Sequence, residues 1–310
     1  MSIKSLAYLV VQSTDQSKWL DYGTNVCGKM EATNMPDNGI VYLRMDERPF
    51  RYAVIKGEID GLLYAGFDLG SEADFNAVAK QLTADGVAYE MITDAADIAS
   101  RAVSGLMRLA DPSGNKLEFS WTADALKEDK TPFKSATDVE AFITKAEDGS
   151  DMGLGHVVFY APTDYEGVHD FYQKLGFIDS DITLLDGMGK IYFMRCNARH
   201  HTLALWSWGA PTPETNFAPS ADSKAPGCVH VMSEVGSLRE VGSCLDRVNE
   251  RGIQVVSSLG EHINDEMKSF YMLTPGNFAL EFGYEGLQLE EDTPVTHNTE
   301  ASIWGHKWQG

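Results

Sequence analysis

Apolar and polar positions alternate near the N-terminus in a pattern that returns in the middle of the chain. The stretch SLAYLVVQSTD predicts a strand that ends in an Asp-containing turn, and LDYGTNVCG predicts a short amphipathic helix closed by glycine. In the second half, GLGHVVFYAPTD and VHDFYQKLGF show the same order of strand, turn and helix. The pattern therefore indicates an internal repeat, which sets the architecture to be expected.

Two further pairs of segments extend the repeat. The segments YAGFDLGSEADFNAVAKQLTADGVAYE and HVMSEVGSLREVGSCLDRVNERGIQVV both read as strand, polar cap, helix, glycine and strand. The segments MRLADPSGNKLEFSW and YMLTPGNFALEFGY both read as two strands joined by a turn that contains proline and glycine. We therefore expect an α+β fold with two domains, each a pair of βαβββ modules.

A polar and acidic stretch at residues 122–151 separates the two halves. At about 150 residues per domain, a chain of 310 residues suggests two domains. We place the N-terminal pair of modules at residues 1–134 and the C-terminal pair at residues 135–290. Residues 291–310 have little periodicity, and we expect a tail that packs on the second domain through Trp304 and Trp308.

Net charge and hydropathy each exclude one class of partner. The chain carries 25 basic and 46 acidic residues, which gives a net charge of −21. Such a field repels the phosphates of nucleic acids, so we expect no nucleic-acid partner. No segment approaches the roughly 20 unbroken apolar residues of a membrane span, so we expect no membrane partner.

Cysteine usage and the N-terminal segment indicate the compartment. The four cysteines show neither a CxxC pair nor the spacing of a disulfide framework, which favours reduced thiols. The segment MSIKSLAYLVVQSTDQ turns polar after a short apolar run and has no small-residue cleavage site, so it reads as a first strand. We therefore expect a cytoplasmic protein.

Three positions of the repeat carry the candidate chemistry, because the second half has imidazoles where the first has phenols. The aligned pairs are Tyr8 and His156, Tyr64 and His230, and Glu118 and Glu281. A single histidine is more often an ordinary partly buried residue than a metal ligand. Here two histidines stand at repeat-equivalent strand positions and a glutamate at the third, so a metal site is the favoured interpretation. Two imidazoles and one carboxylate on three strands are the ligand set of non-haem Fe(II) sites that keep coordination positions open.

Further titratable residues gather in the second half. All eight histidines lie at or after residue 156, whereas solvent-exposed histidines would scatter over both halves. His200 and His201 precede an alternating strand, TLALW, and the segment GEHINDEMKSFY carries His262 shortly before Tyr271. We therefore expect one site, in the second domain, with the first pair of modules free of metal.

Several segments together resemble the type I extradiol ring-cleavage dioxygenases, which belong to the vicinal oxygen chelate superfamily of paired βαβββ modules. They are GLGHVV, CNARHHTLAL, VHVMSEV, GEHINDEMKSFYMLTPGNFALEFGY and SIWGH. The likeness is greatest to 2,3-dihydroxybiphenyl 1,2-dioxygenases and steroid-catechol dioxygenases, and it covers nearly the whole chain. The segment from His262 to Glu281 is the most specific part, because its spacing and residue types match the family signature together.

The resemblance implies roles for nine residues. The implied metal ligands are His156, His230 and Glu281. The implied acid–base residue is His201, and the residues implied to hydrogen-bond a bound catechol are His262 and Tyr271. The supporting residues are Asn264, Asp265 and His200. Glu266 stands where some relatives carry histidine, and this departure touches none of these roles.

The resemblance implies an enzyme that cleaves a 3-substituted catechol, such as 2,3-dihydroxybiphenyl, beside its hydroxyl groups in the breakdown of aromatic compounds. It implies Fe(II) as cofactor, with Mn(II) less favoured, O2 as co-substrate and a homo-oligomeric state. A Pro-rich stretch at residues 207–227 looks longer than usual, so a monocyclic, naphthalene or steroid catechol stays open. Two other classes also stay open: a metal-dependent glyoxalase or epimerase of the same superfamily, and a protein that only binds an apolar ligand.

Overall fold

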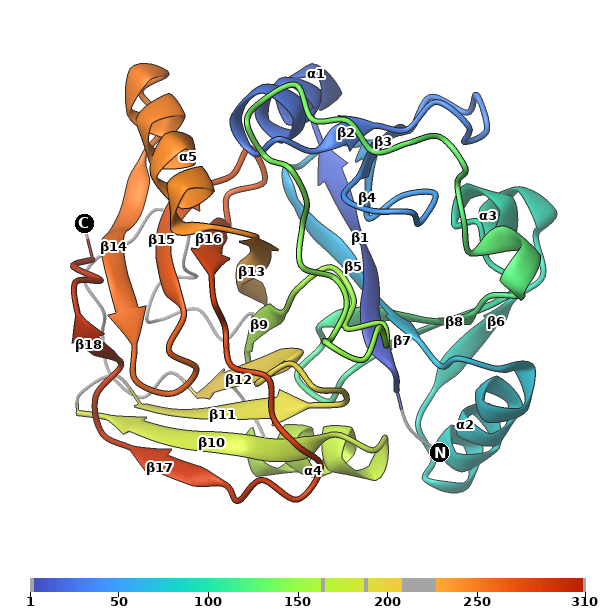
Figure 1. Ribbon diagram of the computed structural model, residues 1–310. Helices are drawn as coiled ribbons and strands as arrows, with labels where there is room; N and C mark the ends of the chain where they lie inside the picture. Colours follow the sequence, from blue (N-terminus) through green and yellow to red (C-terminus); the bar gives the residue numbers. More distant parts are fainter. Residues whose placement is uncertain (1–2, 163–164, 187–188, 208–226, 309–310) are drawn as a thin grey trace.

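The computed structural model of this chain describes residues 3–162, 165–186, 189–207 and 227–308. These residues form four modules that each run strand, helix and three strands, so the expected fold of paired βαβββ modules is confirmed. Figure 1 shows the first two modules, in blue and green, beside the last two, which run from yellow-green to red.

The first pair of modules builds one sheet, whose described strands follow the order β2-β3-β4-β1-β5-β8-β7-β6. The first module contains β1 (Ser5–Ser13), α1 (Gln16–Asp21), the π-helical turn η1 (Tyr22–Val26), β2 (Met30–Glu31), β3 (Val41–Arg44) and β4 (Tyr52–Lys56). The second contains β5 (Gly61–Asp68), α2 (Glu72–Ala84), β6 (Tyr89–Ile92), α3 (Ala95–Ser100), β7 (Gly105–Ala110) and β8 (Lys116–Trp121), and the 3-10 turn η2 (Asp124–Leu126) follows. The modules join where β1 pairs antiparallel with β5.

The second pair builds a sheet in the order β17-β10-β11-β12-β9-β13-β16-β15-β14-β18. The third module contains β9 (Val157–Tyr160), α4 (Tyr165–Lys174), β10 (Ile178–Leu185), β11 (Gly189–Arg195) and β12 (Leu203–Ser207). The fourth contains β13 (Gly227–Val235), α5 (Leu238–Glu250), β14 (Val255–His262), β15 (Lys268–Leu273) and β16 (Ala279–Tyr284). The antiparallel pairing of β9 with β13 joins them, just as β1 and β5 join the first two.

Polar caps fix where the repeat-related helices begin. Ser71 accepts a hydrogen bond from the Asp74 amide at the start of α2, and Ser237 accepts one from the Glu240 amide at the start of α5. A serine followed three residues later by an acidic side chain satisfies amide groups that the first helical turn leaves unpaired. The same sequence signal therefore starts the helix in both halves.

The two pairs of modules share a continuous hydrophobic core. Phe67 of β5 packs edge to face on Phe177, and Trp19 of α1 packs on Phe278, with ring centroids 5.8 Å apart in each pair. These contacts hold the two sheets against one another. The domain boundary between residues 134 and 135 stays a prediction.

The C-terminal tail forms two short strands that the sequence pattern does not predict. β17 (Thr296–Asn298) pairs with β10 at one end of the second sheet, and β18 (Ser302–Trp304) pairs with β14 at the other end. Trp308 packs its ring on Tyr271, with centroids 5.2 Å apart. The tail is therefore fastened to both ends of the sheet, and Figure 1 shows it in red along that domain.

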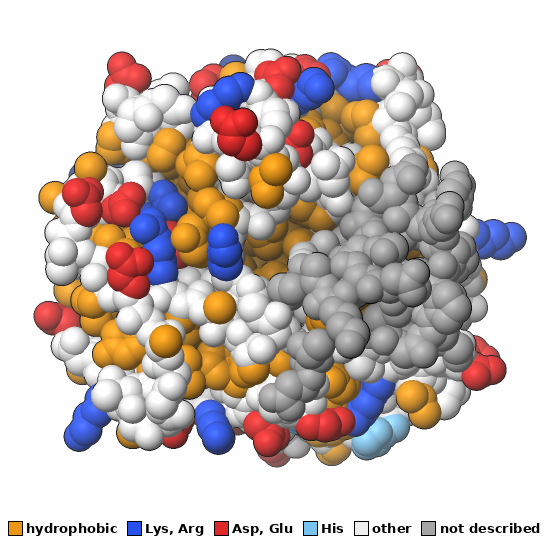
Figure 2. Space-filling model, turned by 180° about the vertical axis from the view of Figure 1, so that it is seen from behind, with side chains coloured by type: hydrophobic (Ala, Val, Ile, Leu, Met, Phe, Trp, Pro, Cys, Tyr) orange, Lys and Arg blue, Asp and Glu red, His pale blue; other side chains and the backbone are white. Residues whose placement is uncertain are grey.

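The surface and the cysteines fit the composition. On the face shown in Figure 2, basic side chains lie in small groups among acidic and apolar ones. Within the described ranges no helix has the length and apolar character needed to cross a bilayer. The four cysteines are free thiols, as the sequence predicts.

Candidate active site

Strand register brings the candidate ligands of the second half together. His230 of β13 pairs with Val158 of β9, two residues after His156, and Met232 of β13 pairs with Glu281 of β16. Side chains two residues apart on a strand point to the same face of the sheet. His156 directly before β9, His230 of β13 and Glu281 of β16 therefore lie at neighbouring positions on one face of the sheet.

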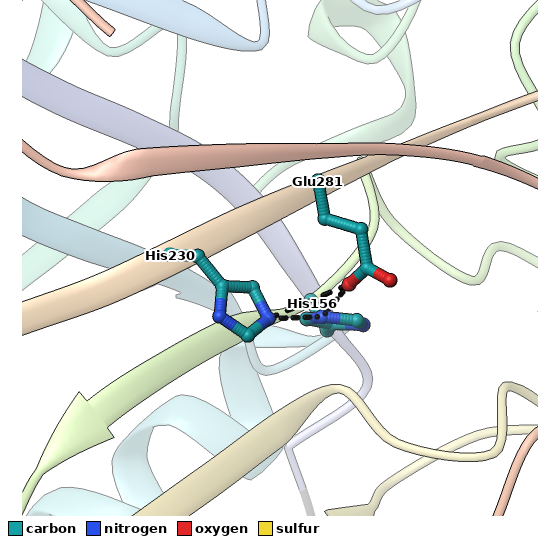
Figure 3. A group of neighbouring side chains, drawn as sticks. All are labelled: His156, His230 and Glu281. Carbon is teal, nitrogen blue, oxygen red and sulfur yellow. Dashed lines mark hydrogen bonds and ion pairs between the residues drawn. The ribbon is translucent and has the colours of Figure 1, made fainter. Parts of the chain in front are cut away.

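The ends of these three side chains converge on one point, as Figure 3 shows. The Nε2 atoms of His156 and His230 lie 3.1 Å apart, and Glu281 Oε2 lies 3.1 Å from the first and 3.4 Å from the second. Two ligand atoms that each lie about 2.1 Å from one cation, at right angles to one another, are separated by about 3 Å. The three atoms therefore suit one face of a single divalent cation.

The charge state of these groups also suits a cation. Burial lowers the pKa of His156 to about 4, so its imidazole is neutral and offers a lone pair at neutral pH. Burial alone would raise the pKa of Glu281, but hydrogen bonds with His156, His230 and His262 hold it well below its usual value. The site thus presents one carboxylate and imidazole nitrogens, a donor set that accepts a divalent metal ion.

A cavity of about 80 Å³ opens beside this point. Its polar lining consists of His201, His230, His262, Asn264, Asp265, Tyr271, Glu281 and Thr183. Its apolar lining consists of Val158, Leu185, Ile191, Phe193, Trp206, Ala301 and Trp308. One side of the cavity is therefore polar and next to the three converging atoms, and the rest is hydrophobic.

His201 is the member of the histidine pair that faces this cavity. Its ring stacks on His156, with centroids 3.9 Å apart, and burial together with the charges of neighbouring histidines holds its pKa well below the usual value. His200 lies behind it, with the two Nδ1 atoms 3.1 Å apart, and is not among the described lining residues. Asp265 Oδ2 lies 3.8 Å from His201 Nδ1, and these three residues form a second group that could hold a metal ion.

His262 and Tyr271 form a hydrogen-bonded pair at the polar side of the cavity. His262 Nε2 lies 2.8 Å from the Tyr271 hydroxyl and 3.2 Å from Glu281 Oε1, and its Nδ1 donates to the carbonyl oxygen of Ala301 at 3.1 Å. Burial alone would lower the pKa of His262, but the hydrogen bond and charge of Glu281 raise it to about 9. Burial raises the pKa of Tyr271 well above its usual value, so its hydroxyl keeps its proton.

The first half holds the same three positions in the same register. Tyr64 of β5 pairs with Val10 of β1, two residues after Tyr8, and Gly66 pairs with Glu118 of β8. The fully buried carboxylate of Glu118 accepts a hydrogen bond from the Tyr8 hydroxyl at 2.9 Å. The repeat alignment from the sequence therefore matches the strand pairing in both sheets.

Two arginines complete this N-terminal centre. Arg101 Nε donates to Glu118 Oε2 at 2.8 Å, and Arg108 Nε donates to Glu118 Oε1 at 2.9 Å. The Arg108 guanidinium also lies over the Tyr64 ring, 5.3 Å from its centroid. Two positive side chains thus neutralise the carboxylate whose counterpart in the second half faces imidazoles.

Most residues of this site are predicted by the sequence, but residues of the tail and of β15 are not. Ser269 donates to Glu281 Oε1 at 2.6 Å, and the ring of His306 packs on that of His262 in a tilted arrangement with centroids 4.0 Å apart. Ala301 and Trp308 line the cavity. The clustering of all eight histidines after residue 155 was the signal that could have pointed to His306.

Two family models match the chain. Residues 6–57 match the model described as Dihydroxybiphenyl dioxygenase BphC D1. Residues 153–282 match the model described as Glyoxalase/Bleomycin resistance protein/Dioxygenase superfamily, and this range contains all three converging side chains.

Curated relatives and a solved structure extend over the whole chain. An iron-dependent extradiol dioxygenase of Rhodococcus jostii (strain RHA1) is 36% identical, over 99% of this chain and 97% of the relative. A biphenyl-2,3-diol 1,2-dioxygenase of Paraburkholderia xenovorans (strain LB400) is 35% identical, over 99% of this chain and 96% of the relative. The crystal structure of a halotolerant catechol dioxygenase superposes with a TM-score of 0.85 at 30% identity, covering 99% of this chain and 95% of that one.

Proposed function

Because this chain belongs to the extradiol ring-cleavage dioxygenases of the vicinal oxygen chelate superfamily, we propose that it cleaves a 3-substituted catechol with O2 at a mononuclear Fe(II) centre. The observation that carries the proposal is the convergence of two histidine nitrogens and one carboxylate oxygen, 3.1–3.4 Å apart, beside a largely apolar cavity. The relatives named as extradiol dioxygenases match the chain over nearly its full length.

His156, His230 and Glu281 would hold the metal ion, and Fe(II) is proposed over Mn(II) because a relative of the whole chain is named iron-dependent. Bound there, Fe(II) would bring the catechol and O2 together and let electrons pass from one to the other. The carboxylate contributes one negative charge against the two positive charges of the ion. A catechol that has lost one proton therefore makes the centre neutral, so the site favours the singly deprotonated substrate.

His262 and Tyr271 are proposed to orient the catechol. Tyr271 keeps its hydroxyl proton and lies within 2.8 Å of His262 Nε2, so both residues offer hydrogen-bond donors at the polar side of the cavity. Donors at this place stabilise a substrate oxygen that carries negative charge. Asn264 and Asp265 line the same side and support the pair.

His201 is proposed as the group that takes up and returns a substrate proton. Its ring lines the cavity and stacks on the proposed ligand His156, so it lies beside the place where O2 and the catechol would meet. Its lowered pKa leaves the imidazole neutral and able to accept a proton. His200 is proposed to support His201 from behind.

The apolar part of the cavity supports a substrate with a hydrophobic 3-substituent. Side chains from four strands, Val158 of β9, Leu185 of β10, Ile191 of β11 and Trp206 of β12, form that part with the tail residue Trp308. Of the Pro-rich stretch 207–227, residues 208–226 lie outside the described part of the chain. The role of that stretch in substrate choice stays a prediction.

Iron-loaded protein is expected to consume O2 with 2,3-dihydroxybiphenyl and to form a yellow ring-opened product that contains both atoms of the O2 molecule. Burial of apolar area contributes roughly 25 cal/mol per Å². Burying the phenyl substituent of 2,3-dihydroxybiphenyl should therefore make its binding free energy about 2–3 kcal/mol more favourable. The kcat/KM for 2,3-dihydroxybiphenyl should then exceed that for catechol roughly 30- to 150-fold. Initial rates of O2 uptake with freshly loaded protein measure both values.

Each outcome of this assay separates one alternative. If no tested catechol, monocyclic, biphenyl, naphthalene or steroid, consumes O2, the dioxygenase assignment is wrong and a glyoxalase- or epimerase-type activity takes its place. Equal values of kcat/KM for catechol and 2,3-dihydroxybiphenyl leave ring cleavage intact but contradict the preference for a bulky 3-substituent. A naphthalene or steroid catechol that surpasses the biphenyl corrects the substrate class alone.

A further inference from the structure

His306 has an unusual backbone conformation, and its position depends on two neighbouring glycines. Its φ of 44° is a left-handed conformation that residues other than glycine rarely adopt. A Cβ on Gly260 of β14 would lie 2.4 Å from the His306 amide nitrogen and 2.6 Å from its ring carbon Cγ. The preceding Gly305 also has a positive φ, and a Cβ there would lie 2.2 Å from the carbonyl oxygen of Leu259. Two glycines and an unusual backbone conformation thus seat this one buried imidazole.

Hydrogen bonds at both nitrogens fix the orientation of the His306 ring. Nε2 lies 3.1 Å from the carbonyl oxygen of Ser269, which can only accept, so Nε2 carries the proton. Nδ1 is then the acceptor, and it receives the hydroxyl proton of Ser302 at 2.8 Å. The ring therefore joins the tail strand β18 to β15, two places further into the sheet, in a single orientation.

Ser269 connects the His306 ring to Glu281, the candidate metal ligand. Its hydroxyl donates to Glu281 Oε1 at 2.6 Å and lies 3.3 Å from His306 Nε2. Glu281 Oε1 is thereby occupied by Ser269 and His262, which leaves Oε2 as the oxygen that faces His156 and His230. The His306 ring also packs on that of His262 in a tilted arrangement, with centroids 4.0 Å apart, so it touches both residues that hold Oε1.

We propose that His306 is a positioning residue that, through Ser269, turns Glu281 so that only Oε2 faces the metal site. This inference rests on the proposed function, because it assigns Glu281 to the metal. Partners that orient a metal ligand typically contribute about 10- to 100-fold to metal affinity. The C-terminal tail would therefore support the metal centre through Ser269, although none of its described residues belongs to the group His156, His230 and Glu281.

The rate of Fe(II) release tests this role without measuring turnover. Anaerobically loaded protein is mixed with an excess of a ferrous chelator, and the coloured complex is followed with time for the wild type, His306→Leu and His306→Gln. His297→Gln is the matched control, because His297 lies exposed on β17 of the same tail. Far-UV circular dichroism and the thermal midpoint of each metal-free protein report whether it is folded.

We expect His306→Leu to release iron about 10- to 100-fold faster than the wild type. His306→Gln should recover most of the loss, because its amide can still donate to the Ser269 carbonyl oxygen, and His297→Gln should match the wild type. A folded His306→Leu protein that releases iron at the wild-type rate overturns the role of His306. A wild-type protein that retains no iron overturns the proposed metal site itself.

A double mutant separates the path through Ser269 from a general loosening of the tail. Contacts that act in series are not additive, so His306→Leu should add little to the release rate of a Ser269→Ala protein. The same fold-increase in both backgrounds would contradict the path through Ser269. Should His306→Leu fail to fold, Gly260→Ala displaces the intact imidazole and is expected to speed release in the same way.

Discussion

Replacing Glu281 with glutamine is expected to lower the affinity for Fe(II) by more than about 100-fold, because the change removes a direct ligand whereas even indirect partners contribute 10- to 100-fold. Ring cleavage should disappear with the metal. The metal-free variant should fold, since an uncharged amide is easier to bury than the carboxylate at this position. Iron content after desalting, together with O2 uptake, measures the effect.

Glu118→Gln makes the same chemical change at the register-equivalent position of the first sheet, and the opposite result is expected. Glu118 accepts charged hydrogen bonds from Arg101 and Arg108, and Arg101 is buried with it. Removing one partner from a buried ion pair destabilises a protein by about 3–5 kcal/mol. The variant should therefore lose stability to urea yet retain iron and turnover while folded. Loss of iron from Glu118→Gln, with iron kept by Glu281→Gln, would contradict the assignment of the centre to the second half.

His201→Phe is expected to lower kcat by about 10²- to 10⁴-fold, the usual contribution of a general acid–base group. Phenylalanine can keep the stacking contact with His156 but cannot hold a proton, so Fe(II) content and catechol binding should stay near the wild-type values. Single-turnover kinetics, with iron measured on the same sample, separate the two effects.

His200→Phe is the matched control for this prediction, because His200 is the sequence neighbour that does not line the described cavity. Its effect on kcat should be clearly smaller. If His201→Phe strips the metal, the ligand assignment is wrong. If His200→Phe lowers kcat further than His201→Phe does, His200 is the acid–base residue instead of His201.

Because the chain contains an internal repeat, much of its fold can be predicted from the sequence. Strand alternation and the serine-led helix caps recur in both halves, so the module order follows from local patterns alone. Aligning the halves also identifies His156, His230 and Glu281, because equivalent positions of the two repeats take equivalent places in the two sheets. Their convergence depends on the pairing of β9, β13 and β16, which the repeat implies but which only the structure displays.

The arginines around Glu118 and the C-terminal tail cannot be placed from any local sequence pattern. Arg101, which directly follows α3, and Arg108 of β7 both reach Glu118, and no spacing in the sequence connects these residues to that carboxylate. The tail lacks periodicity because its strands are only three residues long and pair at the ends of the sheet. His306 therefore could not be placed beside His262 before the fold was known.

Anaerobic titration of the metal-free protein with Fe(II) tests the central claim most directly, that one metal centre in the second half carries out ring cleavage. After each addition, the initial rate of yellow product from 2,3-dihydroxybiphenyl in air is recorded. The rate should start at zero, rise in proportion to added iron and stop rising at one Fe(II) per chain. A break at two Fe(II) per chain, or product formed without iron, would contradict it.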